Sequence, residues 1–263
     1  MTSTVPAAHR IALTAAEYAY LVADLGLSMP PDWAPAPDIA DVGDLAAKRV
    51  LVDGDVHPSI AANLRVVAGP RLMVDTTATA GSRGSRSLHV VAGELGASLF
   101  LLPDAGVELS LFAAVELGRE LVRAVPAEEA GIGSALDGDD DQEPLRGVVP
   151  LAALHELGVA DLLREADPEA PGYVLAELKL PKAEAELALD VVRRTDGVLR
   201  VLVTAVVGGE VRNAQLTWLH SDTGWIGIQP AASGAGRRLV ELVPVERADL
   251  GVWVAPYVAE ALA

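Results

Sequence analysis

The sequence predicts an α+β fold in which a central twisted sheet is built from antiparallel strands. Helix and strand patterns follow the order helices, strands, helix, and this order then occurs a second time. The links between successive strand patterns are short, and short links require antiparallel pairing because a parallel link needs a long crossover. We therefore expect hairpin-connected strands with separate helical layers rather than alternating βαβ units.

A faint internal repeat predicts that the chain consists of two similar halves. Val107-Glu108-Leu109 is matched by Val240-Glu241-Leu242, and in the same register Glu116-Leu117-Gly118 is matched by Asp249-Leu250-Gly251. Five of these six positions are identical, and the sixth keeps its charge. Because self-similarity at a fixed spacing is the signature of a repeated architecture, we expect a quasi-two-fold arrangement of the two halves.

The chain is expected to form one domain over residues 1–263. Its half-repeats would span residues 1–126 and 149–263, joined by an acidic linker at 127–148. Between Pro126 and Glu169 twelve acidic residues stand against two arginines, and charge runs of this kind usually mark exposed chain. We therefore interpret the linker as a solvated connection.

The most clearly patterned stretch runs from Leu88 to Val125. It predicts strands at 88–92, 97–102 and 107–112, because apolar runs there are separated by glycines and by a Pro-Asp pair that favour tight turns. Apolar residues then recur at helical spacing until Pro126, which stops the helix. The stretch therefore reads as a three-stranded meander closed by a helix.

Three helices are expected before the first strand. The first begins at a capping box formed by Thr14 and Glu17. A second is expected to begin at Asp41 or Asp44, and a third opens at His57, which is followed directly by a proline. These helices would form a small bundle.

A loop is predicted to join two long strands of this half. Arg71 to Thr79 is a strand pattern rich in β-branched residues. The following stretch, Thr79 to Ser87, is small and polar, with two glycines and two arginines. We expect it to be a mobile loop at the end of a long hairpin.

The second half is predicted to contain helices, then strands, then a last helix. One or two short helices broken at Gly158 are expected between Pro150 and Arg164, followed by a loop at 167–172 and a short helix from Pro181 to Glu186. Strands and their separating turns complete this half: strands at 187–194, 198–207, 211–220, 225–229 and 238–243, turns at 196–197, 208–209 and 221–224, and a helix at 246–262.

Composition excludes several classes of protein. The chain is 51% apolar and has no cysteine, so it can bury a substantial core but has no disulfide or cysteine nucleophile. A net charge of −17 repels phosphate backbones, which argues against nucleic-acid binding. The sequence shows neither a signal-peptide pattern nor an 18-residue apolar run, so we expect a cytoplasmic protein without a membrane partner.

No group of residues with a recognisable catalytic or metal-binding spacing is found. The five histidines are scattered, and none forms an i, i+4 pair. The acidic run at 137–141 resembles a calcium loop but lacks the glycine and the glutamate that such a loop requires. Phosphate-binding loops and nucleophile elbows are absent from the sequence as well. We therefore expect no enzyme, no cofactor and no metal.

Three stretches resemble a known family. They are Leu13 to Tyr18, His57 to Pro70, and Gly93 to Phe100 followed by Val107-Glu108-Leu109. In these residues, and in element order along most of the chain, the sequence is similar to the EspG family of ESX (type VII) secretion-associated proteins of actinobacteria. The resemblance implies a central antiparallel sheet flanked by two helical bundles in quasi-two-fold symmetry.

The resemblance also implies a function and a partner. It implies a cytosolic, non-enzymatic chaperone that binds the helical tip of a PPE protein in a PE–PPE heterodimer, keeps it soluble and guides it to its secretion system. Family members contact this partner through the loop after the first long strand and through the sheet and bundle of the C-terminal half. Carried onto this chain, the loop residues are Thr79, Gly81, Ser82, Arg83, Gly84, Ser85 and Arg86.

Two other functions remain open from the residues themselves. One is a structural or regulatory protein that associates with itself as a homodimer through uncovered sheet edges. The other is an enzyme of unrecognised type that uses carboxylates such as Glu94 and Glu108. A deep pocket with convergent polar groups would favour the enzyme, whereas a broad shallow face would favour the chaperone. We further expect Arg83 and Arg86 to meet acidic or carbonyl groups of the partner.

Overall fold

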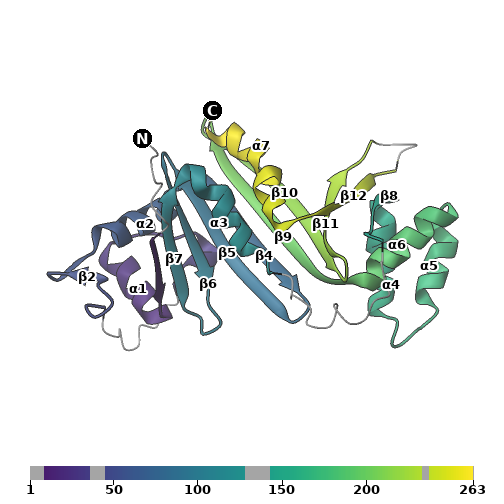
Figure 1. Ribbon diagram of the computed structural model, residues 1–263, viewed down its shortest axis with the longest axis horizontal. Helices are drawn as coiled ribbons and strands as arrows, with labels where there is room; N and C mark the ends of the chain where they lie inside the picture. Colours follow the sequence, from purple (N-terminus) through teal and green to yellow (C-terminus); the bar gives the residue numbers. More distant parts are fainter. Residues whose placement is uncertain (1–8, 36–44, 128–142, 233–236, 263) are drawn as a thin grey trace.

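The computed structural model describes residues 9–35, 45–127, 143–232 and 237–262. These residues form an α+β fold around one large antiparallel sheet of ten strands, in the order β1-β7-β6-β5-β4-β9-β10-β11-β12-β8 (Figure 1). The sheet strands are β1 (His9–Leu13), β4 (Leu72–Ala80), β5 (Arg83–Ala92), β6 (Leu95–Leu101), β7 (Val107–Ala113), β8 (Gly147–Pro150), β9 (Thr195–Val207), β10 (Glu210–Ser221), β11 (Gly224–Pro230) and β12 (Leu239–Val245). The predicted fold class is therefore confirmed.

The described residues also form seven α-helices. They are α1 (Ala15–Asp24), α2 (Pro58–Ala68), α3 (Leu117–Ala124), α4 (Leu151–Leu162), α5 (Ala170–Leu178), α6 (Lys182–Arg194) and α7 (Leu250–Leu262). Six of them pack on the sheet, while α5 packs on α4. Short 3-10 turns precede α3 and α7, at η2 (Ala114–Glu116) and η3 (Arg247–Asp249), and a third, η1 (Pro31–Trp33), lies after α1. A separate two-stranded hairpin, β2 (Leu51–Val52) with β3 (Asp55–Val56), precedes α2. None of the helices within the described ranges is long and apolar enough to cross a membrane.

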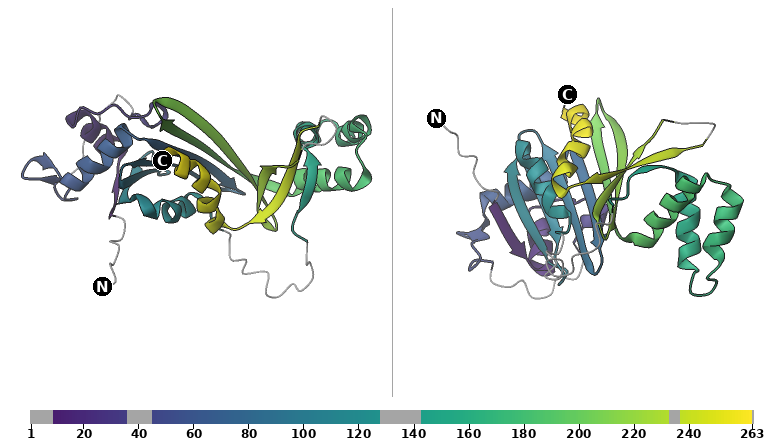
Figure 2. Two further views of the ribbon diagram at one scale, coloured as in Figure 1. Left: turned by 90° about the horizontal axis from the view of Figure 1, so that it is seen from above. Right: turned by 45° about the vertical axis from the view of Figure 1, so that its right-hand side comes forward.

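The helices divide between the two faces of the sheet. Helices α1 and α2 pack on one face at the N-terminal end, around Leu88, Leu99 and Leu109. Helices α4 to α6 form a second bundle at the other end, around Ile226 and Leu242. Strand alternation and register place these core residues on the same face. Helices α3 and α7 cover the opposite face in the middle of the sheet (Figures 1 and 2).

Local sequence signals explain the first helices. Thr14 Oγ1 accepts a hydrogen bond from the Glu17 amide at 3.2 Å, and the Glu17 carboxylate accepts one from the Thr14 amide at 2.8 Å. The predicted capping box is therefore confirmed. Helix α2 begins as expected, with the His57 side chain accepting from the Ser59 amide at 3.2 Å and Pro58 at the first helical position.

Several predicted boundaries are wrong, and the helical packing explains most of them. Residues 187–194 were expected as a strand but continue α6, because Leu187, Ala188 and Val191 lie on the helix face that packs into the C-terminal core. Helix α4 passes through Gly158 without a break, and residues 170–172, expected in a loop, begin α5. The expected second helix is not formed by residues 45–50, which are turns, and its predicted start at residues 41 or 44 lies outside the described residues.

Two predicted connections of the sheet are also wrong. Asp196 and Gly197 were expected to form a hairpin turn, but both lie inside β9. Gly197 pairs with Ala80 of β4 and with His220 of β10, and Asp196 lies at a bulge in the pairing with β10. The expected loop over residues 79–87 is a two-residue turn at Gly81 and Ser82, and residues 83–87 belong to β5. Gly81 adopts a φ of +55°, which glycine tolerates at the first position of a tight hairpin turn.

The two halves of the sheet have the same strand arrangement when they are followed inward from its opposite edges. In this comparison β1 corresponds to β8, β7 to β12, and β4 to β9. The two turns η2 and η3 also fall at matching positions before α3 and α7. A true two-fold repeat nevertheless stays a prediction. Of the expected linker, residues 128–142 lie outside the described residues, and Gly147 and Val148 belong to β8.

Candidate partner-binding surface

None of the described helices or loops covers the middle of the sheet on the face that carries both bundles. Register places eleven side chains from three neighbouring strands on this face, which we call the open sheet face. Its members are half-buried or exposed: Thr77 and Thr79 of β4, Val198, Arg200, Leu202, Thr204 and Val206 of β9, and Val211, Asn213, Gln215 and Thr217 of β10.

The open sheet face mixes apolar and polar groups over a broad area. Leu202, Val206 and Val211 expose 47%, 40% and 63% of their surface, which is unusual for aliphatic residues in the middle of a sheet. Thr204 Oγ1 lies 2.8 Å from Asn213 Oδ1, so polar side chains on this face also bond to one another. An extended apolar surface interspersed with hydrogen-bonding groups suits a protein partner.

At the N-terminal border of this face, Arg86 is held against Trp33. The guanidinium carbon lies 5.1 Å from the centre of the indole ring, and one guanidinium nitrogen of Arg86 lies 3.7 Å from Asp32 and 3.9 Å from Asp75. Trp33 is itself fixed, since its indole nitrogen donates to Asp75 at 3.2 Å and Tyr18 donates to its carbonyl at 2.8 Å. Arg86 is therefore a preorganised cation beside the open sheet face.

The structure divides the predicted partner-binding residues between the two faces of the sheet. Thr79, Gly84 and Arg86 lie on the side of the open sheet face, whereas Arg83 and Ser85 point toward α3. Ser85 Oγ donates to the Ala124 carbonyl at 2.6 Å, and Arg83 donates to the Ala127 carbonyl. Gly81 and Ser82 form the turn at the end of the hairpin. The residues do not form one mobile loop, because strand alternation sends neighbours to opposite faces.

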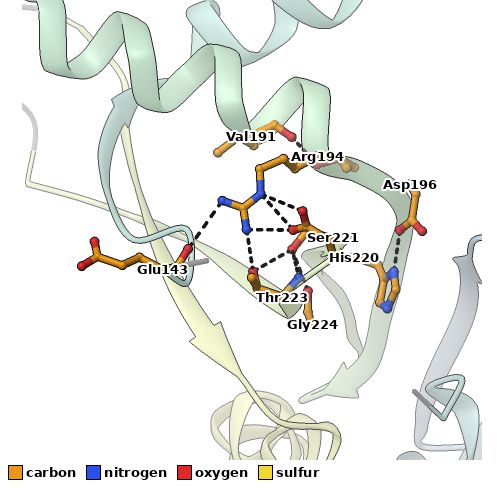
Figure 3. A network of polar contacts seen from close by, with 10 residues as sticks. Glu143, Val191, Arg194, Asp196, His220, Ser221, Thr223 and Gly224 are labelled. Atoms are coloured by element: carbon orange, nitrogen blue, oxygen red, sulfur yellow. Dashed lines mark hydrogen bonds and ion pairs between the residues drawn. The ribbon is translucent and has the colours of Figure 1, made fainter. Parts of the chain in front are cut away.

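A polar hollow of about 500 Å³ lies between this turn and the β10–β11 turn. In Figure 3, Arg194 reaches from α6 to Asp222, Thr223 and the Glu143 carbonyl. His220 Nδ1 lies 2.5 Å from Asp196 Oδ1 on the side of the hollow. Sequence reasoning missed this cluster because the β9 residues were interpreted as a turn, so their approach to the β4–β5 hairpin was not foreseen.

A second hollow, of about 740 Å³, lies on the C-terminal bundle. It is bordered by the first two turns of α4, the end of α5 and the residues just before β12. Its walls combine aliphatic side chains with charges of both signs: Leu151, Leu178 and Leu180 with His155, Glu156, Glu177, Arg237 and Arg238. The C-terminal bundle therefore carries a hollow of its own in which apolar and charged side chains are mixed.

The carboxylates named for an unrecognised enzyme do not converge. Glu94 lies in the β5–β6 turn, whereas Glu108 is ion-paired with Arg123 on the sheet face under α3. Glu120 is buried between Arg10 and Arg123, at 2.8 and 2.9 Å, and hydrogen bonds from both lower its pKa although burial opposes this shift. Within the described ranges no cluster of three or more His, Asp or Glu side chains has the geometry of a metal site.

The open sheet face is a broad surface of mixed polarity that lies between two helical bundles. Such a surface is typical of the class of proteins that bind another macromolecule. The chain belongs to the EspG family, whose family model matches residues 40–255. None of the curated protein sequences matches this chain.

A solved structure has the same fold. The chain is similar to the Mycobacterium tuberculosis type VII secretion system chaperone EspG5, solved in complex with a PE25–PPE41 dimer, with a TM-score of 0.62 and 14% sequence identity. The match covers 96% of this chain and 97% of that chain. Nearly the whole fold is therefore shared, although few residues are.

Proposed function

We propose that this protein is a cytoplasmic, non-enzymatic chaperone of type VII (ESX) secretion that binds a PE–PPE heterodimer. In this proposal it holds the helical tip of the PPE protein, keeps the pair soluble and guides it to its secretion system. Membership of the EspG family and the fold shared with EspG5, which was solved with a PE–PPE dimer, support this function.

The observation that carries the proposal is the open sheet face. Three aliphatic side chains exposed on one face, between two bundles, would lose solvent-exposed apolar area on binding a partner helix. Apolar helix tips aggregate when they are exposed, so covering them with such a face would keep the partner soluble. Arg86 at its border and the charged residues of the bundle hollow would provide partner selection by charge.

Co-expression with the PE–PPE pairs of its own genome tests the proposal. We expect a soluble 1:1:1 complex with one pair, measured by tag pull-down and by size-exclusion chromatography with light scattering. Leu202→Glu should reduce the captured PPE protein at least tenfold, because it places a charge in the middle of the open sheet face. Val252→Glu is the matched control, since Val252 is 71% exposed on α7 on the opposite face. Equal capture by both variants would exclude this face as the binding site.

The two arginines of the β4–β5 hairpin can be separated by the same pull-down. Arg86 borders the open sheet face and Arg83 points to the other side, so Arg86→Glu should weaken capture more strongly than Arg83→Glu. Thermal unfolding of both variants checks that neither change has simply unfolded the chain. If Arg83→Glu is the more damaging change, the partner approaches from the α3 side and the assignment of the face is wrong.

A further inference from the structure

Strand β10 lies between β9 and β11 in the sheet, but about half of it has no partner on the side of β11. Over its whole length β10 pairs with β9. On its other side it pairs with β11 only from Thr217 to Ser221. Among the described residues no strand pairs with the second edge of residues 210–216, because β11 and β12 diverge from β10 beyond Thr217 (Figure 1).

This open edge is accessible. Glu210, Val211, Arg212 and Asn213 are all exposed, and Val211 exposes 63% of its surface. An edge that presents unpaired backbone amide and carbonyl groups is a template for another strand. A strand that is added there gains backbone hydrogen bonds, and the side chains opposite one another determine which strand fits.

We propose that the open edge of β10 pairs with the same edge of a second copy of this chain, forming a homodimer with a two-fold axis at Val211. In this antiparallel pairing Val211 lies opposite Val211 of the second copy. Glu210 then lies opposite Arg212, and Arg212 opposite Glu210. The two sheets join edge to edge through their β9–β10 hairpins.

Charge complementarity selects a second copy as the occupant. Directly opposed residues of antiparallel strands point to the same face, so each Glu210 carboxylate meets an Arg212 guanidinium of the other copy. A two-fold axis makes both contacts at once, as an isologous interface requires. The two exposed valines cover each other on the opposite face. Two chains with a net charge of −17 repel each other, so contact is least unfavourable at an edge where residues of opposite charge face one another.

Arg212 is already oriented within the chain. It forms an ion pair with Glu260 of α7, so its guanidinium lies on the α7 side of the hairpin. Glu210 is on the same face by strand alternation. Each Arg212 would therefore lie between Glu260 of its own chain and Glu210 of the other copy, so that one guanidinium meets two carboxylates in each half of the pairing.

A single introduced cysteine tests the position of the axis, because the natural chain has none. Opposed residues of antiparallel strands have Cα atoms about 4.5–5.5 Å apart, within disulfide range. Val211→Cys should therefore give a disulfide-linked dimer under mild oxidation on non-reducing gels. Leu202→Cys, on the same face but one strand inward, and Val252→Cys, exposed on α7, should form no disulfide and run as single chains on the same gels. A disulfide dimer formed by either control as readily as by Val211→Cys would overturn the proposal.

A charge swap tests the pairing without any covalent bond. Glu210→Arg places arginine opposite arginine twice, and Arg212→Glu, combined with Glu260→Gln, places glutamate opposite glutamate twice. Each variant alone should lose the dimer in sedimentation velocity, and an equimolar mixture should recover it as a heterodimer. Circular dichroism confirms that both are folded. A wild-type chain that stays monomeric at every concentration, or variants that dimerise as well alone as mixed, would refute the proposal.

Discussion

At the scale of single residues, the least expected feature is a buried polar layer beneath α3. Ser87, His89, Ser98 and Ser110 of the sheet and Glu120 of α3 are at most 1% exposed, although the same face of the sheet also carries a large apolar core. Ser87 Oγ lies 3.0 Å from His89 Nε2, and the His89 ring meets Phe100 edge to face at 5.3 Å. Burial of this kind makes the layer sensitive to protonation.

His89 should make the protein less stable in acid. Burial lowers the pKa of His89 to about 3, with nearby Glu120 raising it and Arg123 lowering it to smaller extents. Because the folded pKa lies below the unfolded value, the stabilisation is complete above about pH 6.5 and is lost as the pH falls toward 3. We expect the free energy of unfolding to fall by about 1.4 kcal/mol per pH unit below pH 6.

Denaturant titrations followed by tryptophan fluorescence measure this slope. Trp218 lies 6.5 Å from Trp225 and 5.7 Å from Trp253, so unfolding will change the emission. His89→Gln should remove most of the slope between pH 6.5 and 5, whereas His155→Gln, a change at an exposed residue of α4, should leave it intact. An unchanged slope in the His89 variant would show that other groups cause the acid sensitivity.

At the scale of elements, the pairing of β4 with β9 joins the two halves of the sheet. The two strands pair from Leu72–Ala205 to Ala80–Gly197. Gly197 permits the close approach at one end, because a Cβ atom there would lie 2.2 Å from the Thr79 carbonyl oxygen and 2.8 Å from the Ala80 Cα. The residue that looked like a turn former is therefore required for strand packing.

Gly197→Ala should push β4 and β9 apart. We expect it to lower the free energy of unfolding by about 1–3 kcal/mol, since backbone atoms must move to make room. Gly84→Ala is the matched control on the other side of β4, where the nearest atom to an added Cβ is the Ala78 carbonyl oxygen at 3.7 Å. The control should change stability by less than about 1 kcal/mol. Equal losses of stability in the two variants would mean that the close approach of β4 and β9 at Gly197 does not require a glycine.

At the scale of the whole molecule, one hydrophobic core is shared by the two halves of the chain. One hydrophobic cluster includes Leu72 and Leu121 from the first half together with Leu199, Trp218 and Leu250 from the second. Helices α3 and α7 meet where Gly251 faces Gly118, and Arg247 of the second half donates to the Val122 and Val125 carbonyls at 3.0 and 2.9 Å. We therefore expect the chain to behave as one folding unit.

Separating the halves should abolish cooperative folding. Residues 1–127 and 143–263, expressed apart, each expose one side of the shared cluster and should lack a sharp thermal transition. Mixed in equal amounts, they should associate and recover a single transition, measured by calorimetry and size-exclusion chromatography. A sharp transition in either fragment alone, near that of the intact chain, would mean that the halves are independent domains and that the single-domain prediction is wrong.

Sequence reasoning succeeded where the signal is local. The capping box at Thr14, the helix that opens at Pro58 and the meander from β5 to β7 each depend on residues a few positions apart. It failed where a local pattern is compatible with both a strand and a helix. The apolar residues between Leu187 and Arg194 are an example. Packing against the C-terminal core selected the helix, because that choice buries Ala188 and Val191.

The sequence by itself determined the fold class, the main elements of the central sheet and a resemblance to the family, since periodicity, turn residues and charge are properties of short stretches. Only the tertiary structure decided which surface is left uncovered. The open sheet face and the free edge of β10 come from strands and helices far apart in the chain. Their exposure depends on where α3, α7 and the two bundles pack, because burial is a property of neighbours in space and not in sequence.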